Sequence, residues 1–325
     1  MIIFDHPDRF AQFHQSCVAT IGKFDGVHLG HQLILDQLKQ RAEELNLPTL
    51  VILLEPHPEE FFAGPGGEPP ARLNVVREKL ELLENFGVDF VFQLNFDEKI
   101  SSLSADSYIE EILVQGLGVA VFIIGNDFRF GFGRQGDFAL LQQRGSELGF
   151  EVEETASYEY NGVRISSSYI RQELAVSNFA LVEQLLGRPY SIRGEVQQGR
   201  QLARNLGYPT CNVGLQRLTL PLHGVFACEV RLADRSFNAA VNVGYKPTVT
   251  DERAALLEAH LLDFDEDLYG KSIEVIFRNK IREEMKFDGL DALKTQMSRD
   301  IDKVREMMDV LAAQRVGSGN RSTQP

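Results

Sequence analysis

Apolar and polar residues in the first half of the chain follow two alternating patterns. Short, nearly continuous apolar runs, typical of buried strands, occur at 17–22, 49–54, 88–94 and 119–124. Apolar residues that recur every three or four positions predict helices over 30–46, 74–86, 104–117 and 136–148. This alternation predicts a parallel sheet with helices on both faces, whose ligands bind at the carboxyl ends of the strands.

The pattern changes near residue 186. Short apolar segments separated by Gly and Pro predict strands at 190–197, 224–232, 236–243, 255–262 and 271–278. Closely spaced strands with little helix predict a compact antiparallel barrel. A closing helix is expected, because apolar residues then recur at helical spacing at Leu290, Leu293, Met297, Ile301, Val304, Met308 and Leu311.

These patterns predict two domains, at 1–185 and 186–315, and a small polar tail at 316–325 that is expected to be flexible. The length of 325 residues agrees with two domains. With 43% hydrophobic and 25% charged residues, the composition is that of a soluble globular protein.

Charge and cysteine content restrict the expected partners and compartment. Lys and Arg number 33 against 47 Asp and Glu, and the net charge of −14 disfavours nucleic acid and membrane surfaces as partners. The first ten residues lack a signal-peptide pattern, and the longest apolar run, Val119–Ile124, is too short to cross a bilayer. Three cysteines without a CxxC pair suit a reducing compartment, so we expect a cytoplasmic protein.

The segment Thr20–His31, TIGKFDGVHLGH, places two histidines among glycines at the start of a predicted helix. A helix N-terminus offers free N–H groups and the positive end of the helix dipole. Gly26 and Gly30 let a phosphate approach the backbone. His28 and His31 can donate hydrogen bonds to charge that develops on a transferring phosphoryl group. A capped helix with surface histidines, or half of a metal site without its further ligands, is the alternative.

Two further motifs occur in the same half. Ser166, Ser167 and Ser168 begin a predicted helix and can bind phosphate, and Arg171 can neutralise a departing pyrophosphate. Taken alone, the serine run is more often a plain helix cap. The motif Glu55–Pro58, EPHP, follows a predicted strand, and its two prolines fit a rigid loop equally well.

The second half has candidate groups of its own. Thr210 and Asn212 are two residues apart on an extended segment, so they project to one side, and their oxygens are hard ligands that suit Mg²⁺. Glu258 and His260 share one face of a predicted strand, where a carboxylate can accept a proton from a substrate hydroxyl. An exposed polar face is the commoner role of such a glutamate.

Two glycine patterns resemble nucleotide motifs but lack their context. Gly131–Gly136, GFGRQG, has the spacing of a dinucleotide loop, yet a polar stretch separates it from the preceding strand. Gly194–Arg200 has the glycine spacing of a P-loop without the Lys and Ser/Thr that bind phosphate and metal. The dinucleotide interpretation is therefore disfavoured, and the second motif is not a Walker A motif.

The run GKFDGVHLGH at 22–31 resembles the nucleotide-binding signature of nucleotidyltransferases. In detail it is similar to the adenylyltransferase half of the bacterial bifunctional riboflavin kinase/FAD synthetase (FMN adenylyltransferase) family. The motifs at 55–58, 125–131 (GNDFRFG) and 164–171 (RISSSYIR) agree in the same order. The sequence departs from the family's usual residues at Lys23, Leu54 and Ser168, and none of these changes removes a phosphate ligand.

The resemblance implies a Rossmann-like nucleotidyltransferase domain with a parallel sheet. The residues it implies for ATP and its phosphates are Gly22, Phe24, Asp25, Gly26, His28, His31, Ser166, Ser167, Ser168 and Arg171. The residues it implies for FMN are Pro56, His57, Pro58, Asp127, Phe128 and Arg129. His28 and His31 would act as catalytic stabilisers of charge.

The second half resembles the riboflavin kinase module, a small β-barrel with a closing helix, through GYPTCN, HGVFACEV, NVGYKPTV and LEAHLLDFDEDLYG. The resemblance implies Glu258 as the catalytic base and Thr210 and Asn212 as ligands of Mg²⁺. The residues it implies for ATP in the kinase are Gly199, Arg200, Arg204, Gly207, Pro209, Thr210 and Asn212. Ala203 stands where the family often has glycine, and a positive φ there would strain the loop.

Together these motifs imply two ATP-dependent reactions: phosphorylation of riboflavin to FMN, and adenylylation of FMN to FAD with release of pyrophosphate. FMN and FAD are then products rather than bound cofactors, ATP is a co-substrate, and no oligomeric state is predicted. A flavin-binding oxidoreductase and a regulatory or RNA-binding protein of the same folds are the alternative classes. A nucleotidyltransferase with a different phosphorylated acceptor is the alternative among enzymes.

Overall fold

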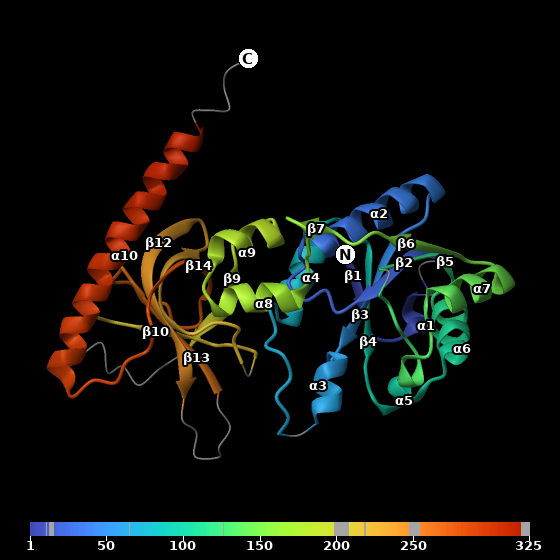
Figure 1. Ribbon diagram of the computed structural model, residues 1–325, viewed down its shortest axis with the longest axis horizontal. Coiled ribbons are helices and arrows are strands. Elements are labelled where there is room, and N and C mark those ends of the chain that lie inside the picture. Colours follow the sequence, from blue (N-terminus) through green and yellow to red (C-terminus); the bar gives the residue numbers. More distant parts are fainter. Residues whose placement is uncertain are drawn as a thin grey trace. The chain divides into compact units, whose positions relative to one another are not determined.

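The computed structural model describes residues 1–10, 12, 16–64, 66–125, 127–197, 208–217, 219–246 and 254–319. The chain forms two compact units (Figure 1). The first unit contains residues 1–70 and 76–167, and the second contains 71–75 together with the chain from residue 168 onward.

The first unit is built on a six-stranded sheet with the strand order β1-β4-β3-β2-β5-β6. Its strands are β1 (Ile2–Phe4), β2 (Cys17–Gly22), β3 (Thr49–Glu55), β4 (Phe90–Asn95), β5 (Val119–Gly125) and β6 (Glu151–Thr155). All the neighbouring strands are parallel. The carboxyl ends of the strands therefore meet at one edge, as the alternating pattern predicts.

Helices cover both faces of this sheet. The helices are α1 (Pro7–Phe10), α2 (Leu29–Leu45), α3 (Pro58–Ala63), α4 (Val76–Asn85), α5 (Glu98–Ser102), α6 (Ala105–Ser107), the π-helix η1 (Tyr108–Gly116), the 3₁₀ turn η2 (Phe132–Arg134) and α7 (Phe138–Leu148). One apolar core contains side chains of η1 and α7, and the other contains side chains of α2 and α4. Burial on both faces explains why the strands read as continuous apolar runs. A short hairpin, β7 (Glu159–Tyr160) and β8 (Val163–Arg164), follows β6.

The second unit is a closed antiparallel barrel with the strand order β10-β13-β12-β11-β14-β9. Its strands are β9 (Ser191–Gln197), β10 (Cys211–Val213), β11 (Gly224–Leu232), β12 (Arg235–Lys246), β13 (Ala254–Leu261) and β14 (Ser272–Arg282). Two helices precede the barrel, α8 (Ser167–Ala175) and α9 (Phe179–Leu186), and α10 (Leu290–Gly319) follows it.

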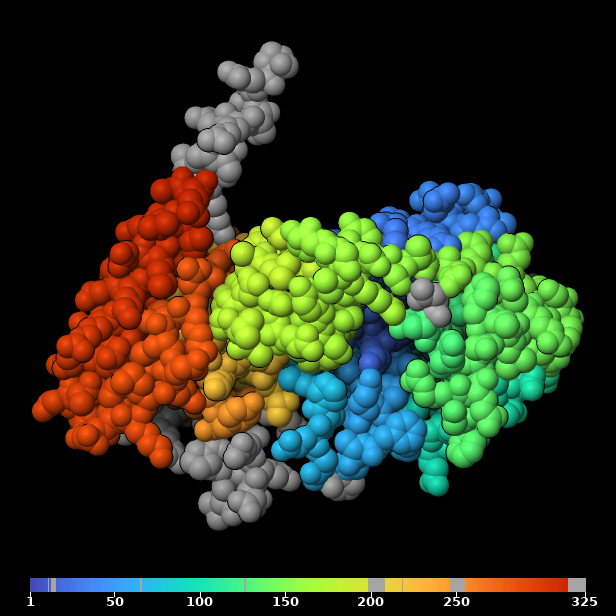
Figure 2. Space-filling model, in the orientation of Figure 1, coloured from blue at the N-terminus to red at the C-terminus, as the bar shows by residue number. Residues whose placement is uncertain are grey.

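Helix α10 packs on the outside of the barrel. Val304 and Met308 are buried against Ala227 and Leu262, and Figure 2 shows α10, in red, directly against the orange residues of the last part of the barrel. The guanidinium of Arg282 binds both oxygens of the Asp300 carboxylate, which is buried. None of the helices in the described ranges combines the length and apolar composition that a membrane span requires.

The fold class predicted from the sequence is confirmed: a parallel sheet, then an antiparallel barrel with a closing helix. The strands at the edges, β1 and β6, and the three-residue β10 were not predicted. Strand β6, EVEET, is mostly acidic, with Val152 as its one apolar residue, and so lacks the apolar run of a buried strand. Helix α10 continues to Gly319, into the segment expected as a tail, and residues 320–325 lie outside the described part.

Candidate functional site

The loop between β2 and α2, residues 22–28, is called the phosphate loop below. Its backbone turns through left-handed conformations at Phe24 (φ 47°), Gly26 (φ 87°) and Val27 (φ 40°). A positive φ at a β-branched valine is uncommon and costs free energy, so the surrounding structure must hold this loop. Such strain is concentrated at functional sites.

The two histidines of the motif lie together at the start of α2. His28 is the N-cap, its Nδ1 accepts from the backbone N–H of His31 at 3.3 Å, and the two rings stack with centroids 3.7 Å apart. A Cβ atom on Gly30 would lie 3.2 Å from the His28 ring, so glycine leaves room for this ring. His28 is 6% exposed. The helix N-terminus and both imidazoles thus form one cluster of donors.

The serine run lies partly in this site. The hydroxyl of Ser167 donates to the backbone oxygen of Asp25 at 2.8 Å, and Asp25 is fully buried in the phosphate loop. Ser168 and Arg171 belong to the second unit, where the Nε atom of Arg171 donates to the carbonyl oxygen of Ala71 at 2.6 Å. The contribution of these two residues to phosphate binding therefore stays a prediction.

The EPHP motif, residues 55–58 and called the EPHP loop below, connects β3 to α3. The peptide between Glu55 and Pro56 is cis, and Pro58 is the first residue of α3. His57 is the buried N-cap of this helix, and its backbone N–H donates to the Glu60 carboxylate at 3.0 Å. The motif therefore forms a rigid turn at the carboxyl end of β3 and begins the next helix.

Lys79 of α4 bonds to both loops and was missed by the sequence analysis. Its Nζ contacts the Glu55 carboxylate and lies 3.0 Å from Nε2 of His57 and 3.2 Å from the carbonyl oxygen of Lys23. The side chain is fully buried. A signal for it was present in the sequence, because Lys79 lies one helical turn before buried Leu83, on the apolar face of α4.

The residues predicted to contact the flavin follow β5. Phe128 stacks on Phe130 at 5.5 Å, and Asp127 forms an ion pair with Arg164 at 2.9 Å. The side chain of Arg129 donates to the carbonyl oxygen of Phe128 at 2.8 Å. Asn126, in the same motif, lies outside the described residues. Their predicted contact with FMN is not tested by these positions.

The glycines of the GFGRQG motif have a packing role in the loop after β5. A Cβ atom on Gly131 would lie 2.7 Å from the backbone nitrogen of Ala105, and one on Gly136 would lie 2.6 Å from the Phe130 ring. Phe130 and Gly136 also pair as an isolated antiparallel bridge. These close contacts account for Gly131 and Gly136 without a dinucleotide, and Gly133 has a positive φ of 63°.

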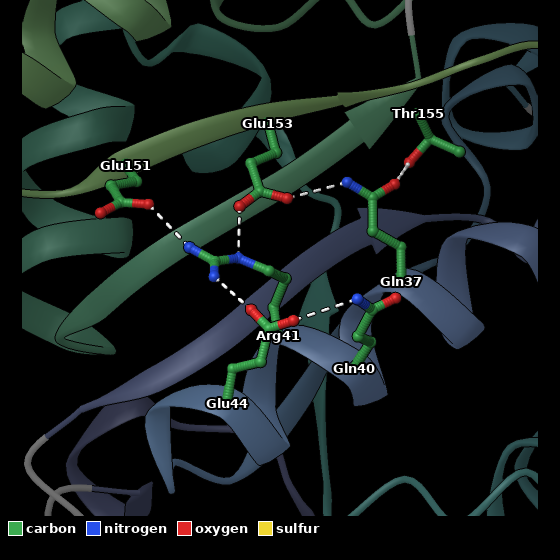
Figure 3. A network of polar contacts seen from close by, with 7 residues as sticks. All are labelled: Gln37, Gln40, Arg41, Glu44, Glu151, Glu153 and Thr155. Atoms are coloured by element: carbon green, nitrogen blue, oxygen red, sulfur yellow. Dashed lines mark hydrogen bonds and ion pairs between the residues drawn. The ribbon is translucent and has the colours of Figure 1, made fainter.

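A polar network fixes helix α2 to the edge strand β6 (Figure 3). Arg41 donates to three carboxylates, those of Glu153, Glu44 at 2.6 Å and Glu151 at 2.9 Å. Gln37 extends the network from Glu153 to the Thr155 hydroxyl. Gln40, the remaining residue, donates to Glu44 at 3.0 Å. Because His28 and His31 lie at the N-terminus of α2, this network holds the helix that presents them.

The second candidate site is a row of polar residues across three barrel strands. Asn212 of β10 lies directly opposite Glu258 of β13, and Glu258 lies directly opposite Asn242 of β12. The neighbours of Glu258 on β13, Leu257 and Ala259, are buried, so Glu258 and its two cross-strand partners lie on the other face of the sheet. Asn242 was missed by the sequence analysis, although a polar residue between Val241 and Val243 was a signal.

His260 of β13 contacts residues 208 and 209, which directly precede Thr210 and β10. Its Nδ1 lies 2.8 Å from the carbonyl oxygen of Pro209, and its ring meets Tyr208 edge-on at 5.7 Å. Because a carbonyl oxygen only accepts, Nδ1 bears a proton. Thr210 follows directly, before Asn212 in the chain. His260 thus contacts the segment that presents the predicted magnesium ligands.

The donors in this segment are oxygens. Burial raises the pKa of the Cys211 thiol to about 11, so it stays protonated at neutral pH and supplies no thiolate between Thr210 and Asn212. Within the described ranges, no group of three or more His, Cys, Asp and Glu residues is arranged to hold a metal ion. Five residues of the predicted kinase loop lie outside the described residues: Gly199, Arg200, Ala203, Arg204 and Gly207.

Comparisons with known proteins agree with this division. The family model for FAD synthetase matches residues 10–169, and the model for riboflavin kinase matches 186–308. The bifunctional riboflavin kinase/FMN adenylyltransferase of Escherichia coli (strain K12) is 47% identical, over 90% of this chain and 93% of that protein. The protein of the same name from Pseudomonas fluorescens is 46% identical, over 90% of this chain and 94% of that protein.

A solved structure with a similar fold is described as a macrolide-efflux protein from Streptococcus pneumoniae. It superposes with a TM-score of 0.78 at 27% identity, and the match covers 94% of this chain and 98% of that one. The two family models and the curated relatives, which extend over both units, assign the chain to the bifunctional riboflavin kinase/FMN adenylyltransferase family.

Proposed function

We propose that the two reactions of the family take place at two separate sites of this chain, one in each unit. The observation that supports this best is that each unit has its own cluster of chemically suited groups. His28 and His31 are stacked at a helix N-terminus in one unit. Asn212 and Glu258 are paired across strands in the other.

At the first site, a phosphate oxygen of FMN attacks the α-phosphorus of ATP. A new P–O bond forms, the bond to the bridging oxygen breaks, and pyrophosphate leaves with the electron pair. The FMN phosphate is already ionised, so the step needs no general base. His28, His31 and the positive end of the α2 dipole would stabilise the charge that develops.

At the second site, the 5′-hydroxyl of riboflavin attacks the γ-phosphorus of ATP, giving FMN and ADP. Glu258 would accept the hydroxyl proton. Thr210 and Asn212 would hold Mg²⁺, which neutralises charge on the ATP phosphates when bound. The hard oxygen donors fit this ion, and the protonated thiol of Cys211 does not compete.

The remaining parts of the proposal concern partners and compartment. Riboflavin, FMN and ATP are the small-molecule partners, and neither nucleic acid nor a membrane is required. A net charge of −14 supports this choice. The described cysteines, Cys17, Cys211 and Cys228, are free thiols, which supports a reducing, cytoplasmic location.

Product chromatography tests the proposal directly. Incubation of the full chain with riboflavin, ATP and Mg²⁺ should yield FMN and then FAD, and supplied FMN should yield FAD and pyrophosphate. Consumption of ATP without FAD would favour a different phosphorylated acceptor. A protein that purifies with stoichiometric flavin and turns over without ATP would instead be an oxidoreductase.

A further inference from the structure

The stability of the fold does not by itself require a charged side chain at position 79. A buried charge is costly unless it is paired and hydrogen-bonded. Replacement of a buried ion pair by apolar residues of similar size is often neutral or stabilising. Lys79 is fully buried on the face of α4 that also presents Leu83, so an apolar side chain would suit this position. The charge therefore indicates a role in arranging the groups around it.

The contacts of Lys79 determine which nitrogen of His57 bears the proton. A lysine ammonium has three donor hydrogens and no acceptor. The acceptors around it include the Glu55 carboxylate, the Lys23 carbonyl oxygen and Nε2 of His57. Nε2 is therefore unprotonated, and the proton of the neutral ring lies on Nδ1. The negative charge of Glu55 balances the positive charge of the ammonium.

We propose that Lys79 is a positioning residue for adenylyl transfer. It holds the phosphate loop and the EPHP loop at a fixed separation and keeps His57 as a neutral ring with Nδ1–H as its donor. This inference rests on the proposed function and on the predicted binding of ATP at the phosphate loop and of FMN at the EPHP loop. Lys79 is buried and acts through the two loops, and a misplacement of reactants by about 1 Å costs on the order of 10²-fold in rate.

An exposed ion pair between the phosphate loop and α3, the helix that the EPHP loop begins, provides a matched control. Nζ of Lys23 lies 2.5 Å from the carboxylate of Glu59 in α3, and these side chains are 36% and 45% exposed. Exposed ion pairs contribute little because water and salt screen them. Glu59→Gln is therefore expected to change the kinetics by less than about twofold.

The kinetic test compares Lys79→Met, the double variant Lys79→Met/Glu55→Gln and Glu59→Gln in the full chain. FMN and ATP are supplied, and kcat and KM are measured for FAD formation. Both Lys79 variants should raise KM for FMN and lower kcat by about tenfold or more. Phosphorylation of riboflavin by the same preparations should be unchanged.

The double variant separates positioning from folding. Lys79→Met alone leaves the Glu55 carboxylate without its buried partner, so it should lower Tm. Glu55→Gln removes that charge, and the double variant should recover Tm while FAD formation stays low. A double variant with wild-type Tm, kcat and KM would overturn the proposal.

A second readout does not depend on turnover. Long-range ¹H–¹⁵N spectra of the wild-type chain should show an unprotonated Nε2 and a protonated Nδ1 for His57, and Lys79→Met should abolish this preference. A protonated Nε2 in the wild type would overturn the role of Lys79. A wild-type chain that makes no FAD would contradict the proposed function instead.

Discussion

The two candidate sites hold their side chains in different ways. In the first unit the groups come from loops that follow different parallel strands, and side-chain bonds such as those of Lys79 join these loops. In the barrel, Asn212, Glu258 and Asn242 lie on neighbouring strands, where backbone pairing places them side by side. One buried side chain therefore affects the first site strongly, whereas the barrel site depends on the register of its strands.

The largest expected effect concerns whether the barrel folds and keeps its site without the helices that precede it. Phe179 of α9 packs on Phe226 and Phe277, with centroids 5.8 and 6.0 Å away, and Val182 and Leu185 are buried. A fragment 186–325 lacks these side chains. It should be less stable than fragment 168–325 by roughly 5 kcal/mol, at about 1.5–3 kcal/mol for each buried side chain.

Urea denaturation of both fragments, followed by a riboflavin kinase assay, measures this difference. Equal stability and equal kinase activity would support the sequence-based boundary at residue 186, which stays a prediction. The structure adds α8, α9 and residues 71–75 to the second unit. Tyr190 and Arg217 bond to backbone oxygens of that segment, so its loss removes hydrogen bonds as well.

The next largest effect concerns the two histidines of the candidate site in the first unit. His28→Ala and His31→Ala should each lower FAD formation by about 10²–10³-fold, because each removes a preorganised donor to the transferring group. Phosphorylation of riboflavin should be nearly unchanged, because Glu258 and its neighbours belong to the other unit. Rates measured with supplied FMN and with riboflavin separate the two activities. Unchanged FAD formation in both variants would contradict the assignment of the histidines.

The corresponding change in the barrel is Glu258→Gln. It keeps the shape and the strand register but removes the proton acceptor, and kinase turnover should fall by about 10²-fold. The expected loss is in the lower part of the range for general bases, because phosphoryl transfer has a loose transition state. FAD formation from supplied FMN should persist. Full kinase turnover would make Glu258 an ordinary strand residue.

The smallest effect concerns the network that holds α2. The hydrogen bond from Arg41 lowers the pKa of the Glu44 carboxyl below its usual 4.5. A lowered folded-state pKa adds stability above pH 4.5, and this stability is lost as pH falls through the lower pKa. Because water screens the exposed Glu44 carboxylate, Arg41→Met should lower Tm only slightly at pH 7, and the difference from wild type should shrink below pH 4.5.

Arg144 of α7 provides the control for this change, because it forms ion pairs with three carboxylates, those of Asp106, Glu110 and Glu147. Arg144→Met should lower Tm similarly and leave FAD formation unchanged. Arg41→Met should also reduce FAD formation slightly, since α2 presents the two histidines. Equal FAD formation in the two variants would show that α2 does not need the network.

The fold class was predictable from the sequence alone, and the motifs indicate where the two candidate sites lie. Continuous apolar runs predicted the buried strands β2, β3, β4 and β5, because burial on both faces selects apolar residues at every position. The histidine motif and the alternation around Glu258 were also readable, because each depends on residues close together in the chain. Two-residue spacing alone predicts that Thr210 and Asn212 project to one side of an extended segment.

Contacts between residues that are distant in the sequence follow from the tertiary structure. Lys79 lies 22 and 24 residues from His57 and Glu55 in the sequence, and no local pattern indicates that they bond. The register that places Asn242 and Asn212 on either side of Glu258 likewise follows from the closed barrel. Local propensities act over a few residues, whereas these contacts depend on how whole elements pack. The chemical groups of the motifs could therefore be predicted from the sequence, whereas the hydrogen bonds that hold these motifs in place could not.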